Sequence, residues 1–340
     1  MIEIDGSAGE GGGQIIRSSL ALSALTGKPF KVQKIRAGQK RPGLLRQHLT
    51  GVTATAEICS ARLEGAELKS QELVFEPGEV RAGDYHYTIG TAGSALLVLQ
   101  TILPPLLRAD GPSRVTLEGG THNPAAPPFE FIGDTFVPVL GRMGASVRVR
   151  LLRPGFYPAG GGKLEVEIDP VDTLRTVSLL DRGEVMGIRG TVIVAGLSRA
   201  IAEKEAHYLS RDLEIEMDAI EIVEVTGSRG PGNVILVHVD CATHTEVFSG
   251  FGAKGVPAPR VVAELATEVR GYLAADAPVG VHLADQLMIP FALAGGGAYR
   301  TVGMTPHAST NVEVIQRFLD VEFGVSRLKR GDVRVEVAPK

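Results

Sequence analysis

One pattern of elements recurs three times along the chain, and this repeat restricts the folds it can adopt more than any other feature. In each copy a turn rich in glycine or other small residues leads into an apolar helix, and a second helix follows. The first helices are predicted within residues 6–26, 90–107 and 279–294, and the second within 42–59, 127–143 and 310–319. Alternating apolar and polar residues after each pair indicate strands with one buried face. We therefore predict an α+β fold with three repeats of two helices over a four-stranded sheet.

A different segment separates the second copy from the third. Residues 181–276 show a strand, a helix, three strands and a closing helix, and the first of these helices (198–213) is dense in charged residues, as an outward-facing helix would be. We predict that 181–276 form a small inserted α/β domain. The main domain would then consist of residues 1–180 together with 277–340.

Composition excludes several classes of protein. The 42 glycines among 340 residues follow no G-X-Y period, which excludes collagen. A hydrophobic content of 44% with a net charge of −4 excludes a disordered chain. The two cysteines cannot form a disulfide framework, the start of the chain lacks a secretory signal, and the most apolar stretch, 95–107, is too short to cross a bilayer. We therefore expect a cytoplasmic protein with no membrane partner.

Positive charge is concentrated near the N-terminus. Residues 11–56 contain no acidic residue. They contain eight basic ones: Arg17, Lys28, Lys31, Lys34, Arg36, Lys40, Arg41 and Arg46. This segment is either a solvated basic face or a phosphate-binding surface, since clustered Arg and Lys hold anions. The slightly acidic chain as a whole is unlike a protein that coats duplex DNA.

The glycine-rich segment 6–14 precedes a predicted helix that carries Arg17 in its first turns. Backbone amides at such a helix start favour an anion, and Arg17 adds a forked donor. Glu10 is the one acid in this segment, and it is either an exposed turn residue or a ligand for a divalent ion that accompanies a polyphosphate. The triplet 11–13 would let the backbone approach phosphates, whereas the triplets 160–162 and 295–297 would mark turns of the repeated fold.

Among the eight histidines, His307 has the most informative position. It follows Pro306 and precedes residues 310–313, whose Thr-Asn-Val-Glu sequence has the form of a capping box that opens a helix. The positive end of a helix dipole keeps a neighbouring histidine neutral, and neutral imidazole is a competent nucleophile toward phosphorus. A histidine near a helix cap with no chemical role is the alternative.

Other motifs are weak. Residues 250–255 match GxGxxG, but Pro257 and Pro259 delay the helix that a dinucleotide site requires. No pair of histidines has the spacing of a zinc hydrolase.

Taken together, five segments resemble the RNA 3′-terminal phosphate cyclases, and the likeness runs essentially end to end. The segments are 5–18, 35–49, 155–162, 283–287 and His307 with Thr310-Asn311. The resemblance implies ATP as co-substrate, a divalent metal (Mg²⁺ or Mn²⁺) and RNA 3′-phosphate ends as partner, and it is compatible with a homodimer. The implied reaction forms a covalent histidine–AMP, passes AMP to the RNA 3′-phosphate, and closes a 2′,3′-cyclic phosphate with release of AMP.

The resemblance also implies site residues. His307 matches the nucleophile, and Glu10 matches the glutamate associated with the metal. The nucleotide-binding positions are Glu10, Arg17, Gln100, Pro127, Phe248, His282, Asp285 and Gln286, with Phe248 as the aromatic ring that stacks on adenine. The positions that handle phosphate and the RNA end are Arg36, Lys40, Arg41, Gln47 and His48.

The chain departs from the family at three positions. Gln39 stands where the family usually has arginine, so Lys40 or Arg41 would have to substitute. His282 stands where tyrosine is frequent, and Pro154 where a basic residue is frequent.

The family's fold consists of three units of two helices over a four-stranded sheet, with an inserted domain. Similar units build the enolpyruvyl transferases. An enolpyruvyl-type transferase is therefore one alternative function. Another is a non-catalytic relative in ribosome biogenesis, a branch that lacks the nucleophilic histidine; the presence of His307 favours the enzyme.

Overall fold

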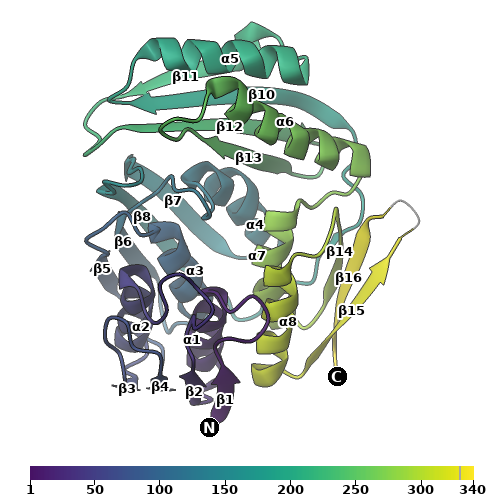
Figure 1. Cartoon of the computed structure of the whole chain (residues 1–340). Helices are drawn as coiled ribbons and strands as arrows, with labels where there is room; N and C mark the ends of the chain where they lie inside the picture. Colours follow the sequence, from purple (N-terminus) through teal and green to yellow (C-terminus); the bar gives the residue numbers. More distant parts are fainter. Residues whose placement is uncertain (329–330) are drawn as a thin grey trace.

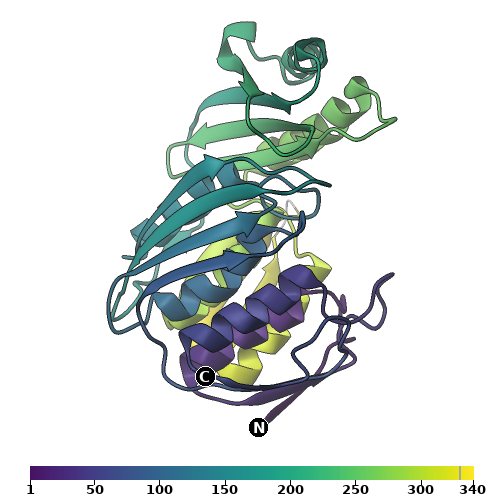
Figure 2. The same ribbon diagram turned by 90° about the vertical axis from the view of Figure 1, so that its left-hand side faces the viewer.

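The computed structural model describes residues 1–328 and 331–340. These residues form a mixed α/β structure with eight α-helices and four small sheets of four strands each (Figure 1). Three of the sheets, with the helices that belong to them, make up a body that contains both chain termini. The fourth sheet and its two helices form the opposite end of the molecule, as both views show (Figures 1 and 2).

The first unit of the body has its sheet in the order β1-β2-β4-β3, with β1 parallel to β2 and the remaining pairs antiparallel. Its elements are β1 (Ile2–Asp5), α1 (Gln14–Thr26), β2 (Phe30–Gln33), α2 (Arg46–Ile58), β3 (Arg62–Glu64) and β4 (Leu73–Glu76). Both predicted helices are present, and the glycine-rich segment 6–13 is the loop that leads into α1.

The second and third units have the same strand order and the same senses of pairing. The second consists of β5 (Asp84–Thr88), α3 (Ala95–Leu106), β6 (Ser113–Gly119), η1 (Phe131–Phe136), α4 (Val137–Arg142), β7 (Ser146–Arg153) and β8 (Gly162–Asp169). The third consists of β9 (Ser178–Leu179), α7 (Val281–Leu293), β14 (Gly297–Thr301), α8 (Pro306–Phe318), β15 (Val321–Arg327) and β16 (Val333–Pro339). Element η1 is a stretch of widened π-type turns that runs directly into α4.

The fourth sheet lies between β9 and α7 in the sequence. Its elements are β10 (Val185–Ala195), α5 (Arg199–Leu213), the short helix η2 (Met217–Ala219), β11 (Ile220–Val225), β12 (Gly232–Cys241), β13 (Thr245–Phe251) and α6 (Ala258–Ala275). We call these elements together the α5–α6 unit. Along β12 successive apolar residues face opposite ways. Ile235 and Val237 pack under α5 and α6 in a core of the unit's own, whereas Val234 and Leu236 join the core of the body. The unit is therefore seated on the body through an apolar sheet face.

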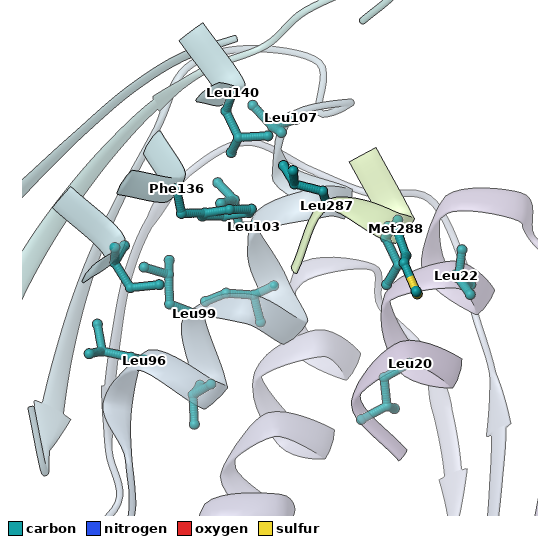
Figure 3. Close-up of a cluster of buried hydrophobic side chains, with 14 of the residues drawn as sticks. Leu20, Leu22, Leu96, Leu99, Leu103, Leu107, Phe136, Leu140, Leu287 and Met288 are labelled. Atoms are coloured by element: carbon teal, nitrogen blue, oxygen red, sulfur yellow. The ribbon is translucent and has the colours of Figure 1, made fainter. Parts of the chain in front are cut away.

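The core of the body lies among the helices (Figure 3). Leu99 and Leu103 of α3, Phe136 of η1, and Leu287 and Met288 of α7 are buried side by side there. Burying one such leucine stabilises the fold by about 1.5–3 kcal/mol. This packing fixes the helices that carry the polar residues described below. The apolar stretch 95–107 is therefore a core helix, and no helix in the described part of the chain is long and apolar enough to cross a membrane.

The start of α8 corrects one prediction from the sequence. The helix begins at Pro306, and its N-cap is Thr305, whose hydroxyl accepts a hydrogen bond of 3.1 Å from the Ala308 amide. The expected capping box at residues 310–313 lies inside the helix. Proline is well suited to the first helical position because its missing N–H has no partner there, so Thr305-Pro306 starts the helix one turn earlier. His307 consequently lies in the first turn of α8.

Candidate active site

A chain of hydrogen bonds joins three helices at one place in the body. The Arg17 guanidinium donates to the side-chain oxygen of Gln14, and the Gln14 amide donates to the hydroxyl of Ser18 at 3.2 Å. Ser18 donates to the side-chain oxygen of Asn311 at 2.6 Å, and the Asn311 amide lies 3.4 Å from the Asp285 carboxylate. The network fixes polar groups of α1, α8 and α7 relative to one another.

A cavity of about 40 Å³ lies beside this network. Four of the predicted nucleotide-binding residues line it together: Arg17, Gln100, Asp285 and Gln286. The volume exceeds that of a single water only slightly, so a nucleotide would have to lie across the mouth of this cavity or widen it.

Two buried polar atoms beside this cavity have no hydrogen-bond partner within the described chain, namely Nε of Arg17 and Oε1 of Gln100. Unpaired buried polar groups are costly. A ligand with an anionic group and an N–H donor would satisfy both, which is the chemistry of a nucleotide.

The charge in this cavity depends on the pKa values of Arg17 and Asp285. Burial lowers the pKa of Arg17 to about 10, against the opposing charges of Asp285 and Glu10, so the guanidinium remains protonated at neutral pH. Burial raises the pKa of Asp285, and the charges of Arg17 and His307 act in the opposite direction. Arg17 is therefore a permanent cation between two carboxylates.

His307 and Glu10 are brought together from opposite ends of the chain. The Nδ1 atom of His307 is in direct contact with the Glu10 carboxylate, and the imidazole is 48% exposed. The Glu10 amide donates a 3.2 Å hydrogen bond to the hydroxyl of Thr310, which attaches the glycine-rich loop to α8. Because a carboxylate oxygen can only accept a hydrogen bond, we assign the imidazole proton to Nδ1, which faces Glu10. The lone pair of Nε2 is then free. The pair has the arrangement of a nucleophile with an orienting acid.

The glycine-rich loop is held by close contacts that only glycine permits. A Cβ on Gly9, whose φ is +56°, would lie 2.2 Å from the Thr310 hydroxyl. A Cβ on Gly13 would lie 2.5 Å from Nε2 of His48 and 3.0 Å from the Arg17 guanidinium. Gly13 is thus required by the approach of two side chains, which adds a packing role to the phosphate approach predicted for the triplet 11–13.

His48 is a buried neutral base next to Arg17. Its Nδ1 accepts a hydrogen bond of 3.1 Å from the Leu45 amide at the start of α2. Burial, together with the nearby charges of Arg17 and Arg36, lowers its pKa to about 3. A proton on Nδ1 would break the bond to Leu45, so His48 stays uncharged throughout the physiological range and does not attract phosphate by charge.

We expect His48 to make stability depend on pH. Its pKa is lower in the folded state than in the unfolded state, so protonation favours unfolding as the pH falls from about 6.5 toward 3. Between pH 7 and pH 5 this residue alone should cost about 2 kcal/mol of unfolding free energy. Denaturant unfolding of wild type and His48→Gln across this range measures it: the difference in stability between the two should shrink at low pH. Parallel pH profiles would contradict the assignment.

Among the remaining phosphate-handling candidates, Arg36, Lys40 and Arg41 lie on the loop before α2, and Gln47 lies in the first turn of α2. Gln47 accepts a 3.0 Å hydrogen bond from the Ser94 amide at the N-cap of α3. The Arg36 guanidinium is turned inward and donates to the carbonyl of Arg41 and, at 3.2 Å, to that of Gly43. Arg36 therefore closes this loop, and Lys40 and Arg41 are exposed on it.

Gln39, at a position where the family usually has arginine, bonds with the loop that holds Glu10. Its amide donates to the Glu10 carbonyl at 3.3 Å. Through this contact the 36–43 loop touches the glycine-rich loop directly.

Three predicted residues lie apart from this group. Phe248 belongs to β13 and is only 5% exposed in the core of the α5–α6 unit, with its ring 5.2 Å from that of Tyr272. A ring buried there has no free face for an adenine, which corrects the stacking role expected of Phe248. Pro127 is half-buried in the loop between β6 and η1. His282 is exposed in the first turn of α7, and the Glu268 carboxylate, 3.5 Å away, raises its pKa.

Sequence reasoning assigned no role to several residues that build the site. Gln14, Ser18 and Asn311 form the network, Thr310 holds the glycine-rich loop, and Phe136 lines the cavity. Gln14, Ser18, Thr310 and Asn311 belong to segments that carry the family resemblance, and this was the one available signal. No sequence signal pointed to Phe136, because an aromatic residue in an apolar helix is interpreted as a core residue.

A divalent ion would find one carboxylate here rather than a complete set of ligands. No group of three His, Cys, Asp or Glu side chains that could hold a metal occurs among residues 1–328 and 331–340. Mg²⁺ is usually bound through one or two carboxylates and the phosphates of its substrate, and Glu10 fits such partial ligation.

Fold and site together define a class of protein. A mixed α/β body holds a histidine–carboxylate pair near a polar cavity that contains a buried arginine, a combination suited to chemistry on phosphate groups.

Comparison with known proteins gives the particular family. The family model described as RNA 3′-terminal phosphate cyclase matches residues 8–325. A curated RNA 3′-terminal phosphate cyclase of Koribacter versatilis (strain Ellin345) is 51% identical over 326 residues, which cover 96% of this chain and 92% of that protein. The chain therefore belongs to the RNA 3′-terminal phosphate cyclase family, and the expectation of an enzyme of this family is confirmed.

Proposed function

We propose that the protein converts an RNA 3′-terminal phosphate to a 2′,3′-cyclic phosphate at the expense of ATP, through a covalent histidine–AMP. The observation that carries this proposal is the contact between Nδ1 of His307 and the Glu10 carboxylate, beside a buried arginine that lacks a partner for Nε. Family membership supports the cyclase activity and the RNA end as substrate. The geometry supports His307 as the nucleophile.

The first step forms the bond between Nε2 of His307 and the α-phosphorus of ATP and breaks the bond from that phosphorus to the β-phosphate oxygen. Pyrophosphate leaves. The imidazole gains positive charge as the bond forms, and the Glu10 carboxylate at Nδ1 stabilises that charge. Arg17, permanently protonated, neutralises charge that develops on the phosphates.

Two transfers complete the reaction. An oxygen of the RNA 3′-phosphate attacks the AMP phosphorus and displaces His307, which leaves as neutral imidazole. The ribose O2′ then attacks the phosphorus of the 3′-phosphate, loses its proton, and displaces AMP. Both transfers depend on holding the RNA end near His307, and Gln47 with the exposed Lys40 and Arg41 are the residues we assign to it.

A divalent metal, when bound, would neutralise the triphosphate and favour loss of pyrophosphate. Glu10 is the carboxylate placed to hold it together with the phosphates.

Incubation with ATP labelled at the α-phosphate tests this function. Label retained on the denatured protein and passed to a 3′-phosphorylated RNA supports it. Turnover of an enolpyruvyl donor without retained label would indicate the enolpyruvyl-type transferase. RNA binding with neither label nor product would indicate the non-catalytic ribosome-biogenesis relative.

We expect Arg17→Ala to impair nucleotide handling while the fold stays intact. Arg17→Ala removes a bidentate cation from a buried phosphate site. The efficiency of histidine–AMP formation should therefore fall by about 10²–10³-fold, mainly because a higher ATP concentration is needed to reach half of the maximal labelling rate. ATP titration of the labelling rate measures this, with Arg62→Ala, an exposed arginine on β3, as matched control. An unchanged ATP dependence in Arg17→Ala would overturn the role of this residue.

The architecture supports three finer proposals. The shared strand order of the three body units suggests repeats of the kind found in enolpyruvyl transferases. We propose residues 1–180 with 277–340 as the main domain and 181–276 as the inserted domain, whose sheet continues the body core. The free Cys59 and Cys241 suit the reducing cytoplasm, and a homodimer stays a prediction.

A further inference from the structure

A large cavity lies away from His307. It has a volume of about 1320 Å³ and lies between the α5–α6 unit and the body. On one side it is bounded by α5 and by the loop from β13 to α6. On the other side two body loops reach it, through His122 with Pro124 and through Phe156, Tyr157 and Pro158. None of the residues assigned above to ATP or to the RNA end lines this cavity, which we call the junction cleft.

Exposed apolar side chains gather at the junction cleft. Tyr157 is 66% exposed, and Leu197, Ile201 and Val256 are also exposed there. Apolar groups clustered around a hollow mark a binding surface more often than chance exposure does. Tyr157 belongs to segment 155–162, one of the five that carry the family resemblance. The reaction proposed at His307 assigns no role to this segment.

The buried part of the cleft is polar. Glu205 and Asn233 are both buried, and the Asn233 amide donates a 2.7 Å hydrogen bond to the Glu205 carboxylate. Nearby, the Phe156 ring is stacked on that of His122, with centroids 5.1 Å apart. Phe156 and His122 are both buried, whereas Tyr157 offers the cleft an aromatic ring with a free face. An exposed ring and apolar walls with an acid and an amide beneath them are elements that hold nucleobases by stacking and by their hydrogen-bonding edges.

The mouth of the cleft carries positive charge. Lys204 and Lys254 are exposed there, and neither forms an ion pair within the described part of the chain. Glu203, which also lines the cleft, is paired with Arg199 at 3.1 Å. The free charge at the mouth thus suits a phosphate backbone.

One segment of main chain, 91–94, separates the cleft from the phosphate-handling residues. On one side the Ser94 amide donates to Gln47. On the other, a Cβ on Gly160 would lie 2.6 Å from the Thr91 carbonyl and 2.8 Å from Ala92. A strand whose 3′ end is held near Gln47 would therefore meet the cleft as its next nucleotides leave the site.

We propose that the junction cleft binds single-stranded RNA nucleotides upstream of the reacting 3′ end, with bases stacked on Tyr157 and backbone phosphates near Lys204 and Lys254. This rests on the proposed function. The proposal assigns segment 155–162 to substrate binding, and it predicts that the enzyme binds longer RNA more tightly than short RNA.

A length series of 3′-phosphorylated single-stranded oligonucleotides, from two to twelve residues with one common 3′ end, tests the proposal. Wild type should show a KM that falls by about 10-fold or more with length, as stacking of one or two bases would give. Tyr157→Ala should abolish most of this gain while the KM for the dinucleotide and the amount of histidine–AMP stay unchanged. Met186→Ala, an equally exposed apolar residue of β10, is the control and should match wild type.

A second variant guards against a folding defect at Tyr157. Lys254→Glu alters an exposed loop side chain and should raise the KM of the long oligonucleotides alone. An unchanged KM for long RNA in both variants, or a wild type with no length dependence, overturns the proposal and leaves the cleft to another partner such as a protein. Absence of histidine–AMP in wild type would instead refute the proposed function.

Discussion

His307→Ala is expected to lose the covalent AMP entirely. The exposed imidazole is the nucleophile we propose, because its Nδ1 contacts the Glu10 carboxylate and its Nε2 would be left to attack phosphorus. Two other histidines were named for the site, but His48 is buried and neutral, and His282 is paired with Glu268 in the first turn of α7, outside the set of residues that lines the cavity. Label from α-labelled ATP on denatured protein should fall by at least about 10³-fold.

The matched control is His86→Ala. His86 is an exposed histidine of β5 that pairs with Glu118 at 3.2 Å, and its loss should leave the label at the wild-type level. Mass spectrometry of the intact chain should show one added AMP in wild type and in His86→Ala. Label at the wild-type level in His307→Ala would make another residue the nucleophile.

Helices and the residues on their faces could be predicted from the sequence wherever the periodicity of apolar residues within one helix determined them. All six helices predicted for the body end within one residue of those observed. The start of α8 differs, because Thr305 with Pro306 caps the helix earlier than Thr310. Arg17, Gln100, Asp285 and Gln286 were expected in one pocket and line one cavity. Each lies on a long helix whose face is set by its apolar residues.

Side-chain positions that depend on contacts between distant segments could not be predicted. In β13 the adjacent Val247 and Phe248 face opposite ways, and the sequence does not show which of them faces a ligand; Val247 joins the core of the body and Phe248 the core of the α5–α6 unit. The approach of His48 to Gly13 depends on how α2 docks on α1, which no local pattern encodes. The triplet 160–162 was expected to punctuate a repeat, but a Cβ on Gly161 would lie 2.2 Å from the Arg229 side chain, so this loop also forms the contact with the α5–α6 unit.

The second large effect is expected at Glu10, where two roles are distinguishable. As the partner of Nδ1, Glu10 fixes the tautomer of His307 and stabilises the charge that forms on it. As a metal ligand, it would act through the ion instead. Glu10→Ala should slow histidine–AMP formation by about 10²–10⁴-fold, up to the loss of about 10⁴-fold seen when the aspartate that orients the catalytic histidine of a serine protease is replaced.

A metal titration separates the two roles. If Glu10 acts on the imidazole, the rate in Glu10→Ala stays low at every Mg²⁺ or Mn²⁺ concentration. Glu10→Gln, whose amide oxygen can still accept from Nδ1–H without carrying charge, should then lie between Glu10→Ala and wild type. If Glu10 serves only to hold the ion, excess metal should restore the rate in both variants and the contact with His307 would have no catalytic weight. Glu67→Gln, an exposed carboxylate of the same unit, should behave as wild type throughout. Because each variant is compared at saturating ATP, a change in nucleotide affinity does not enter the comparison.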